Sequence, residues 1–143
     1  MTEEANNDTQ PTVLVVDDND ELRGLLRVWL GKYGCRVVEA ADGPTAVIVA
    51  QRERPDLIFM DLHMPKMDGF AAAYRIRSLA MLDEQMPIIA VSADGALGIE
   101  ARQPSTEAYD VGFTDFVPKP FSPGQLKDIL THYLPGSAGM LKM

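Results

Sequence analysis

Short apolar runs alternate along this chain with longer stretches in which apolar residues recur at helical spacing. Strands are expected at 13–16, 36–40, 57–61, 88–92 and 114–117. The run from Leu57 to Met60 is continuously apolar, which is typical of a strand covered on both faces. Helices are expected around the apolar stripe Leu22, Leu25, Leu26, Trp29 and Leu30, and then at 43–54, 69–80, 105–110 and 123–134.

The ends of these helices carry recognisable signals. Asn19 or Asp18 can cap the first helix, and Gly34 is expected to end it. Ser122, with Gln125 three residues later, predicts a capping box at the start of the last helix. The chain therefore contains clear boundaries between its predicted elements.

Strands that alternate with helices through short connections predict a doubly wound α/β domain with a five-stranded parallel sheet and five helices on two faces. The flavodoxin-like strand order 2-1-3-4-5 would place the first and third strands side by side at the switch point. We expect one domain over residues 12–134, a disordered lead-in over 1–11 and a tail over 135–143.

Composition narrows the class of protein. The net charge of −8 argues against direct binding of nucleic acid, which requires a basic face. No apolar run approaches the ~20 residues needed to cross a bilayer, and Cys35, the single cysteine, allows no internal disulfide. A soluble, cytoplasmic protein is expected, in which Cys35 is a small apolar core residue.

Polar side chains follow four of the predicted strands. Asp17 and Asp18 come after the first, Asp61 ends the third, Ser92 ends the fourth and Lys119 follows the fifth. Parallel strands end at a common edge of the sheet, which is where open α/β sheets bind their ligands. We therefore expect these groups to converge.

Three converging carboxylates repel one another, at ~4 kcal/mol for two charges ~4 Å apart at an effective dielectric of ~20. A hard cation relieves that repulsion, and an all-oxygen set suits Mg²⁺. An aspartate nucleophile, a divalent cation, a lysine and a hydroxyl make a site suited to phosphoryl transfer. Taken singly, each group has another interpretation: Asp17 and Asp18 as helix caps, Lys119 as a solvated side chain and Ser92 as a turn cap.

The same residues resemble those of a known family. Asp17-Asp18, Asp61 followed by Met64-Pro65-x-Met67-Asp68-Gly69, Ser92-Ala93 and Lys119-Pro120 are similar to the motifs of the receiver domain of two-component response regulators. The resemblance covers about residues 12–134. It implies a phosphorylation-dependent switch in place of an ordinary enzyme, since the domain would catalyse only its own phosphorylation and dephosphorylation.

The resemblance also implies a role for each matching residue. Asp61 is the expected phospho-acceptor, and Asp18 and Asp61 are expected to bind Mg²⁺ directly together with the backbone carbonyl of His63. Asp17 is expected to act on the cation largely through water. Lys119 is the expected ion-pair partner of the phosphoryl group, and its bond to Pro120 is expected to be cis.

Two further residues are implied to form the switch. Ser92 is the hydroxyl that turns toward the phosphoryl group, and Phe116 is the aromatic residue that moves inward with it. This chain has Ser92 where the family often has threonine, and its segment from Ser92 to Lys119 is longer than usual in the family. The extra length falls near 94–103 and is expected to alter the geometry of the fourth helix, at 105–110, relative to the family.

The resemblance implies partners for this chain, and two other functions compete with it. The resemblance implies phosphate transfer from a sensor histidine kinase or a histidine phosphotransfer protein, an unidentified downstream protein, and a homodimer as one form of the phosphorylated domain. The alternative is a Mg²⁺-dependent phosphatase with an aspartyl nucleophile, which would carry an Asp-x-Asp pair after the first strand. A nucleotide-binding module is disfavoured because no glycine-rich phosphate loop follows a strand.

Overall fold

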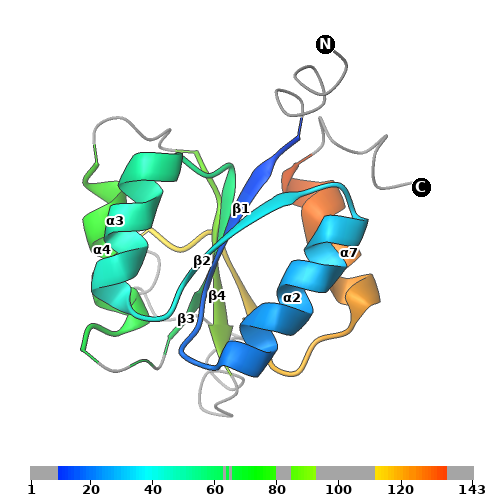
Figure 1. The fold of residues 1–143 in the computed structure, drawn as a ribbon. Coiled ribbons are helices and arrows are strands. Elements are labelled where there is room, and N and C mark those ends of the chain that lie inside the picture. The colour runs from blue at the N-terminus through cyan, green and yellow to red at the C-terminus, as the bar shows by residue number, and fades with distance from the viewer. Residues whose placement is uncertain (1–9, 63, 65, 80–84, 93–111, 135–143) are drawn as a thin grey trace.

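A single parallel sheet with helices on both faces organises the chain (Figure 1). The computed structural model describes residues 10–62, 64, 66–79, 85–92 and 112–134. The strands are β1 (Thr12–Val16), β2 (Arg36–Ala40), β3 (Leu57–Asp61), β4 (Ile88–Ser92) and β5 (Asp115–Pro118). The helices within the described residues are α2 (Asp20–Lys32), α3 (Gly43–Glu53), α4 (Gly69–Arg77) and α7 (Pro123–Tyr133).

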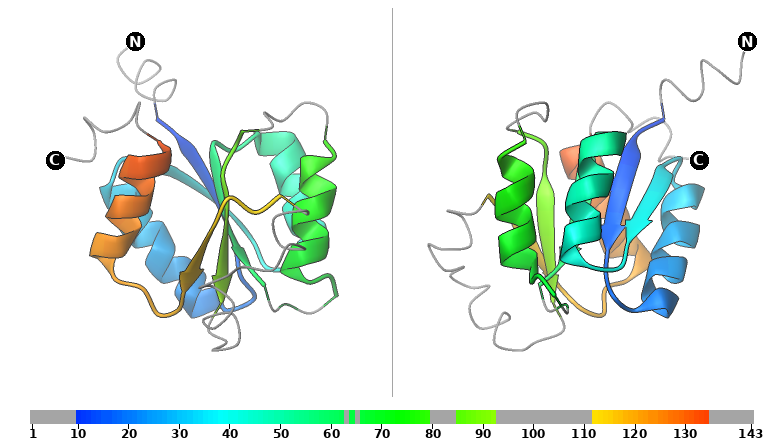
Figure 2. Two further views of the ribbon diagram at one scale, coloured as in Figure 1. Left: turned by 180° about the vertical axis from the view of Figure 1, so that it is seen from behind. Right: turned by 60° about the vertical axis from the view of Figure 1, so that its left-hand side comes forward.

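The strand order is β2-β1-β3-β4-β5, and every neighbouring pair is parallel. The predicted doubly wound topology is therefore confirmed. Helices α3 and α4 cover one face of the sheet and α2 and α7 the other, as the views from behind and from the side show (Figure 2). The helix expected over 105–110 lies outside the described residues. No helix within the described residues is long and apolar enough to cross a membrane.

Burial explains why the central strands are apolar throughout. Every residue of β3 and of β4 is buried, because both strands have a strand on each side and helices on each face. Alternate residues of β3 enter opposite cores: Ile58 and Met60 pack with α3 and α4, whereas Leu57 and Phe59 pack with α2 and α7. The sheet thus divides the interior into two apolar clusters.

The helix caps hold the loops at one end of the sheet. Asn19, and not Asp18, caps α2, because its side chain accepts hydrogen bonds from the N–H groups of Glu21 and Leu22. Ser122 forms the predicted capping box with Gln125 at the start of α7. These caps lie beside the carboxyl ends of the strands and therefore fix the loops around the candidate site.

Helices α2 and α4 end close to their expected positions. α2 stops at Lys32, and Gly34 follows with the positive φ of 85° that favours glycine. α4 ends at Arg77, earlier than the predicted end at Ala80, and Ser78 caps it. The sequence shows no glycine or proline at that point, so the earlier end was not predicted.

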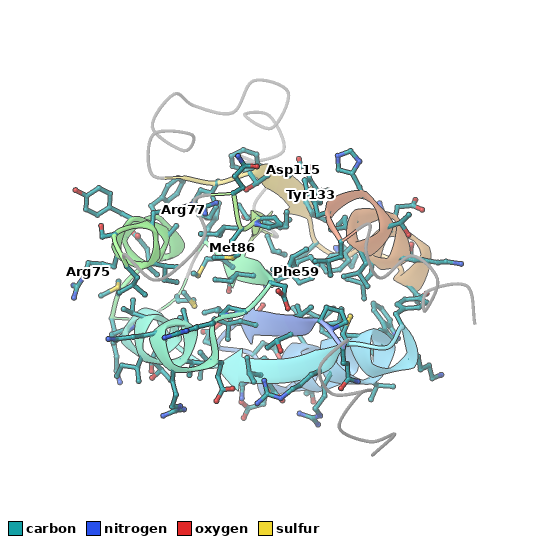
Figure 3. All side chains as sticks on the ribbon, turned by 90° about the horizontal axis from the view of Figure 1, so that it is seen from above. Phe59, Arg75, Arg77, Met86, Asp115 and Tyr133 are labelled. Carbon is teal, nitrogen blue, oxygen red and sulfur yellow. The ribbon has the colours of Figure 1, made fainter. Side chains whose placement is uncertain are left out.

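Side-chain hydrogen bonds connect β5 and the residues just before it to helices on both faces; Figure 3 labels Arg77, Asp115 and Tyr133, which take part in them. Arg77 of α4 donates from Nε and Nη2 to the carbonyl oxygen of Gly112, at 3.0 and 2.9 Å. The Tyr133 hydroxyl of α7 donates to Asp115 Oδ2 at 2.6 Å. Tyr133 thereby holds β5 itself, and Arg77 holds the segment that leads into it.

Three smaller observations concern single residues and the start of the chain. Cys35 is buried, and burial followed by the negative charge of Asp56 raises the pKa of its thiol to about 11. It is therefore a core residue, as predicted. His132 is exposed on α7. The expected disordered lead-in over 1–11 is too long, because Pro11 is buried and its carbonyl accepts a hydrogen bond from the Arg36 N–H.

Candidate functional site

Three carboxylates meet at the carboxyl edge of the sheet. Val16 of β1 lies in register with Met60 of β3, so the residues that follow, Asp17 and Asp61, leave neighbouring strands side by side. One oxygen each from Asp17, Asp18 and Asp61 lies within 4.8 Å of the others. The adjacency of β1 and β3 thus creates the acidic pocket.

The three acids differ in exposure. Asp17 and Asp61 are only 3% and 5% exposed, whereas Asp18 is exposed to solvent. The backbone N–H of Asp17 donates to the Ala40 carbonyl, and the Asn19 N–H donates to Asp17 Oδ1 at 2.9 Å. Asp17 is therefore held by its neighbours, while Asp18 forms the solvent side of the pocket.

Lys119 brings a positive charge to the two buried acids. Its Nζ lies 2.7 Å from Asp17 Oδ2 and 3.6 Å from Asp61 Oδ2. Pro118 ends β5 opposite Ser92, and the next residue, Lys119, donates its N–H to the Ser92 carbonyl at 2.8 Å. The bond between Lys119 and Pro120 is cis, the isomer that the resemblance implies.

The two expected switch residues lie beside this pocket. Ser92 is the last residue of β4 and is 1% exposed. Phe116 is half-buried on β5 in register with Ala90, and its ring lies 5.9 Å from that of Phe113. Both residues therefore belong to the same pair of strands, two positions apart in register.

The loop after β3 folds tightly beneath Asp61. Gly69, the first residue of α4, donates its N–H to the Leu62 carbonyl, and a Cβ built on Gly69 would lie 2.4 Å from the carbonyl oxygen of Asp61. Only glycine fits such a close approach. Within this loop Lys66 has a positive φ of 73°. His63, whose carbonyl was expected to bind the cation, lies outside the described residues.

The donor set fits a hard divalent cation. Among the described residues, the Lys119 ammonium pairs with two of the three carboxylates, those of Asp17 and Asp61, so negative charge remains in excess. Like charges this close repel strongly where burial limits screening by water. Carboxylate oxygens are the ligands that Mg²⁺ prefers. Asp17, Asp18 and Asp61 are the residues that could hold it.

Sequence reasoning missed two features near the pocket. Arg23 of α2 donates from Nη1 to the carbonyl oxygen of Asp17 at 2.7 Å. Its position one turn after the Asn19 cap was the available signal. Leu25, expected to face the core, is 43% exposed. It lines an open groove of about 560 Å³ together with Asn19, Leu22, Leu26, Trp29, Lys119, Pro120 and Phe121.

The fold and the pocket define a doubly wound α/β domain that gathers acids and a lysine at the switch point of its sheet. The family model of the response regulator receiver domain matches residues 13–131. The chain therefore belongs to the response regulator receiver domain family, as its motifs indicated.

Relatives and solved structures agree with this membership. Sporulation initiation phosphotransferase F of Bacillus subtilis is 32% identical over 123 residues, covering 86% of this chain and 93% of that protein. Among solved structures, the chain is similar to the receiver domain of sensor histidine kinase PA1611 of Pseudomonas aeruginosa, which has a magnesium ion coordinated in the active site cleft. The two are 32% identical, with a TM-score of 0.75, and the match covers 88% of this chain and 98% of that one.

Other relatives are longer than this chain. A probable transcriptional regulator, ycf27 of Guillardia theta, is 35% identical over 120 residues, covering 84% of this chain. The match spans 44% of that relative's length. The chain thus spans less than half the length of the first curated relatives that it matches.

Proposed function

We propose that this chain is a signalling switch in which Asp61 accepts a phosphoryl group from a phosphohistidine of a sensor histidine kinase or a histidine phosphotransfer protein. One observation carries the proposal. The buried carboxylate of Asp61 ends the central strand with the Lys119 ammonium 3.6 Å away and carboxylate oxygens of Asp17 and Asp18 within 4.8 Å.

The transfer requires little covalent chemistry from the protein. A carboxylate oxygen of Asp61 forms a bond to phosphorus as the phosphorus–nitrogen bond of the donor breaks, and the bonding electron pair leaves with the imidazole. Positioning and charge stabilisation account for most catalysis of this kind. Lys119 lies close enough to both buried acids to stay beside the phosphoryl oxygens after transfer.

Mg²⁺ is the proposed cofactor. Asp18 and Asp61 would hold it directly, and Asp17 largely through water. When bound, it would neutralise charge on the phosphoryl oxygens. Asp17 and Asp18 restrict the choice of ion by offering only hard oxygen ligands. The solved receiver domain with magnesium in its active site cleft supports this assignment.

Two relatives support the choice of partner. An autoinducer 1 sensor kinase/phosphatase, LuxN of Vibrio campbellii, is 41% identical over 88 residues, covering 62% of this chain and 10% of that protein. The Bacillus relative described above is named a phosphotransferase. Phosphorylated by such a partner, the chain would act only on its own carboxylate, through phosphorylation and dephosphorylation, and not on outside substrates.

Mixing the purified chain with acetyl phosphate and Mg²⁺ is expected to add one phosphoryl group per chain, measured by intact-mass spectrometry. EDTA is expected to prevent the addition, because without a cation the three carboxylates carry more negative charge than Lys119 can offset and repel the anionic donor. Continuous hydrolysis of p-nitrophenyl phosphate without a stable phospho-protein would contradict the proposal and favour an aspartyl phosphatase.

Ser92→Ala is expected to leave phosphate uptake intact but to weaken the response of Phe116. The phosphoryl group adds acceptor oxygens at the pocket, and the Ser92 hydroxyl is the donor that would turn toward them. Loss of one hydrogen bond corresponds to about 1 kcal/mol of coupling. NMR of the Phe116 ring with and without beryllofluoride, a phosphoryl mimic, measures the change.

Ser78→Ala is the control for this prediction. Ser78 is exposed at the end of α4, and its hydroxyl donates to the Tyr74 carbonyl within the same helix. Its removal is expected to leave the response of Phe116 unchanged. A full wild-type shift pattern in Ser92→Ala would show that Ser92 does not couple the two sites.

A further inference from the structure

Arg23 is fixed from three directions beside the acidic pocket. Its Nη1 donates to the carbonyl oxygen of Asp17 at 2.7 Å, and its Nε donates to Glu39 Oε1 on β2 at 3.1 Å. Its Nη2 pairs with Asp20 in the first turn of α2. Only 15% of the Arg23 side chain is exposed. The guanidinium is therefore a half-buried group whose orientation is fixed by its partners.

The carbonyl that Arg23 holds belongs to the peptide group that joins Asp17 to Asp18. The N–H of Asp17 is fixed on the Ala40 carbonyl, and its side chain accepts a hydrogen bond from Asn19. The bond from Arg23 fixes the plane of the next peptide group. Rotation of that plane would change the directions of the Asp17 and Asp18 side chains relative to Asp61.

We propose that Arg23 is a positioning residue, which holds the Asp17–Asp18 peptide group in the orientation that aims both carboxylates at Asp61 and thereby raises the affinity of the pocket for a divalent cation. The inference rests on the proposed function in one respect, that the pocket binds such a cation. Arg23 itself touches neither the cation nor the phosphoryl group in this account.

Charge and geometry predict opposite effects of removing Arg23. A positive charge near the pocket repels a cation, so its loss acting through charge alone would tighten cation binding. Loss of the hydrogen bond to Asp17 would loosen the acid pair and weaken binding. Removing Arg23 would also take a positive partner away from Asp20 and Glu39, which adds to the charge effect. Weaker binding in the variant would therefore have to come from lost geometry, and this is the result we expect.

Lysine cannot replace this group. The guanidinium is a rigid fork that reaches the Asp17 carbonyl, Glu39 and Asp20 at once, whereas an ammonium group is a compact point charge on a flexible stem. Arg23→Lys keeps the charge and loses the fork. It therefore separates an effect of charge from an effect of orientation.

The experiment measures Mn²⁺ binding from the loss of the electron paramagnetic resonance signal of free Mn²⁺, which accepts the same oxygen ligands as Mg²⁺. Arg23→Met and Arg23→Lys are each expected to weaken binding about tenfold, the scale of losses for groups that orient metal ligands. Asp18→Asn alters a proposed ligand, so its loss of Mn²⁺ affinity shows how large the effect of damage to the site itself is.

Arg27→Met is the matched control. Arg27 lies on the same helix and pairs with the same Glu39, at 2.6 Å, but it is 57% exposed. It is expected to keep Mn²⁺ affinity within about twofold of the wild type. Circular dichroism at the temperature of the titration establishes that every variant compared is folded, so that a loss of stability is not mistaken for a loss of affinity.

The outcomes separate the two proposals. Mn²⁺ binding by Arg23→Met as tight as in the wild type, or tighter, overturns the role of Arg23 while the metal site stands. A wild-type chain that binds no Mn²⁺ overturns the metal site and this inference with it. Should Arg23→Met not fold, Glu39→Gln tests the same anchor, with an expected loss of about twofold to tenfold; unchanged affinity there overturns the inference.

Discussion

Asp61→Asn is expected to abolish phosphate uptake from acetyl phosphate. Asparagine has nearly the same shape as aspartate, but its amide offers no anionic oxygen to attack phosphorus. The fold is expected to remain intact, because the change removes one of three mutually repelling carboxylates and leaves Asp17 paired with Lys119 at 2.7 Å. Intact-mass spectrometry measures uptake, and thermal melting measures stability.

Asp68→Asn is the matched control for this loss. Asp68 lies on the same loop, is exposed and caps α4 by accepting a hydrogen bond from the Ala71 N–H, a role that asparagine fills equally well. It makes the same change of charge, so uptake at the wild-type level is expected. Phosphate uptake by Asp61→Asn at the wild-type rate would show that another residue is the acceptor.

Gly69→Ala is expected to lower the free energy of unfolding by about 1–3 kcal/mol, the usual cost of an added methyl group in a filled site. The new Cβ would lie 2.4 Å from the carbonyl oxygen of Asp61 and 2.9 Å from the Cα of Leu62. Both are backbone atoms, which cannot move without displacing the end of β3. Urea unfolding measures the loss, and phosphate uptake is expected to slow with it.

Gly31→Ala makes the same substitution where there is room. A Cβ on Gly31 would meet nothing within 4 Å, and the residue is exposed in α2. Alanine is there expected to raise the free energy of unfolding by roughly 0.5–1 kcal/mol, because glycine is a poor helix residue. Equal stability of Gly69→Ala and the wild type would mean that the loop relaxes freely around Asp61.

The sheet could be predicted from the sequence because a strand that is buried on both faces is apolar at every position. β3 and β4 are buried throughout, and both appear in the chain as unbroken apolar runs. The pocket followed from topology, since Asp17 and Asp61 end neighbouring parallel strands. A strand order derived from short right-handed connections was therefore enough to bring these acids together.

Details set by contacts between distant segments could not be predicted. Leu25 follows the helical apolar pattern, yet it lines an open groove beside Phe121, because no element covers that part of α2 within the described residues. Arg23 looks like an ordinary helix residue until the structure places Glu39 beside it. Helical spacing predicts on which face of a helix a side chain lies, but not which residues of other segments pack against that face.

The acids of the pocket come from the ends of two strands, β1 and β3, so Asp18 and Asp61 lie far apart in the chain. An unfolded chain does not hold these groups together, so a cation that needs both binds the native state alone. Mass action then makes the melting temperature depend on cation concentration. At about 100 times its dissociation constant, such an ion would add about 2.7 kcal/mol to the free energy of unfolding.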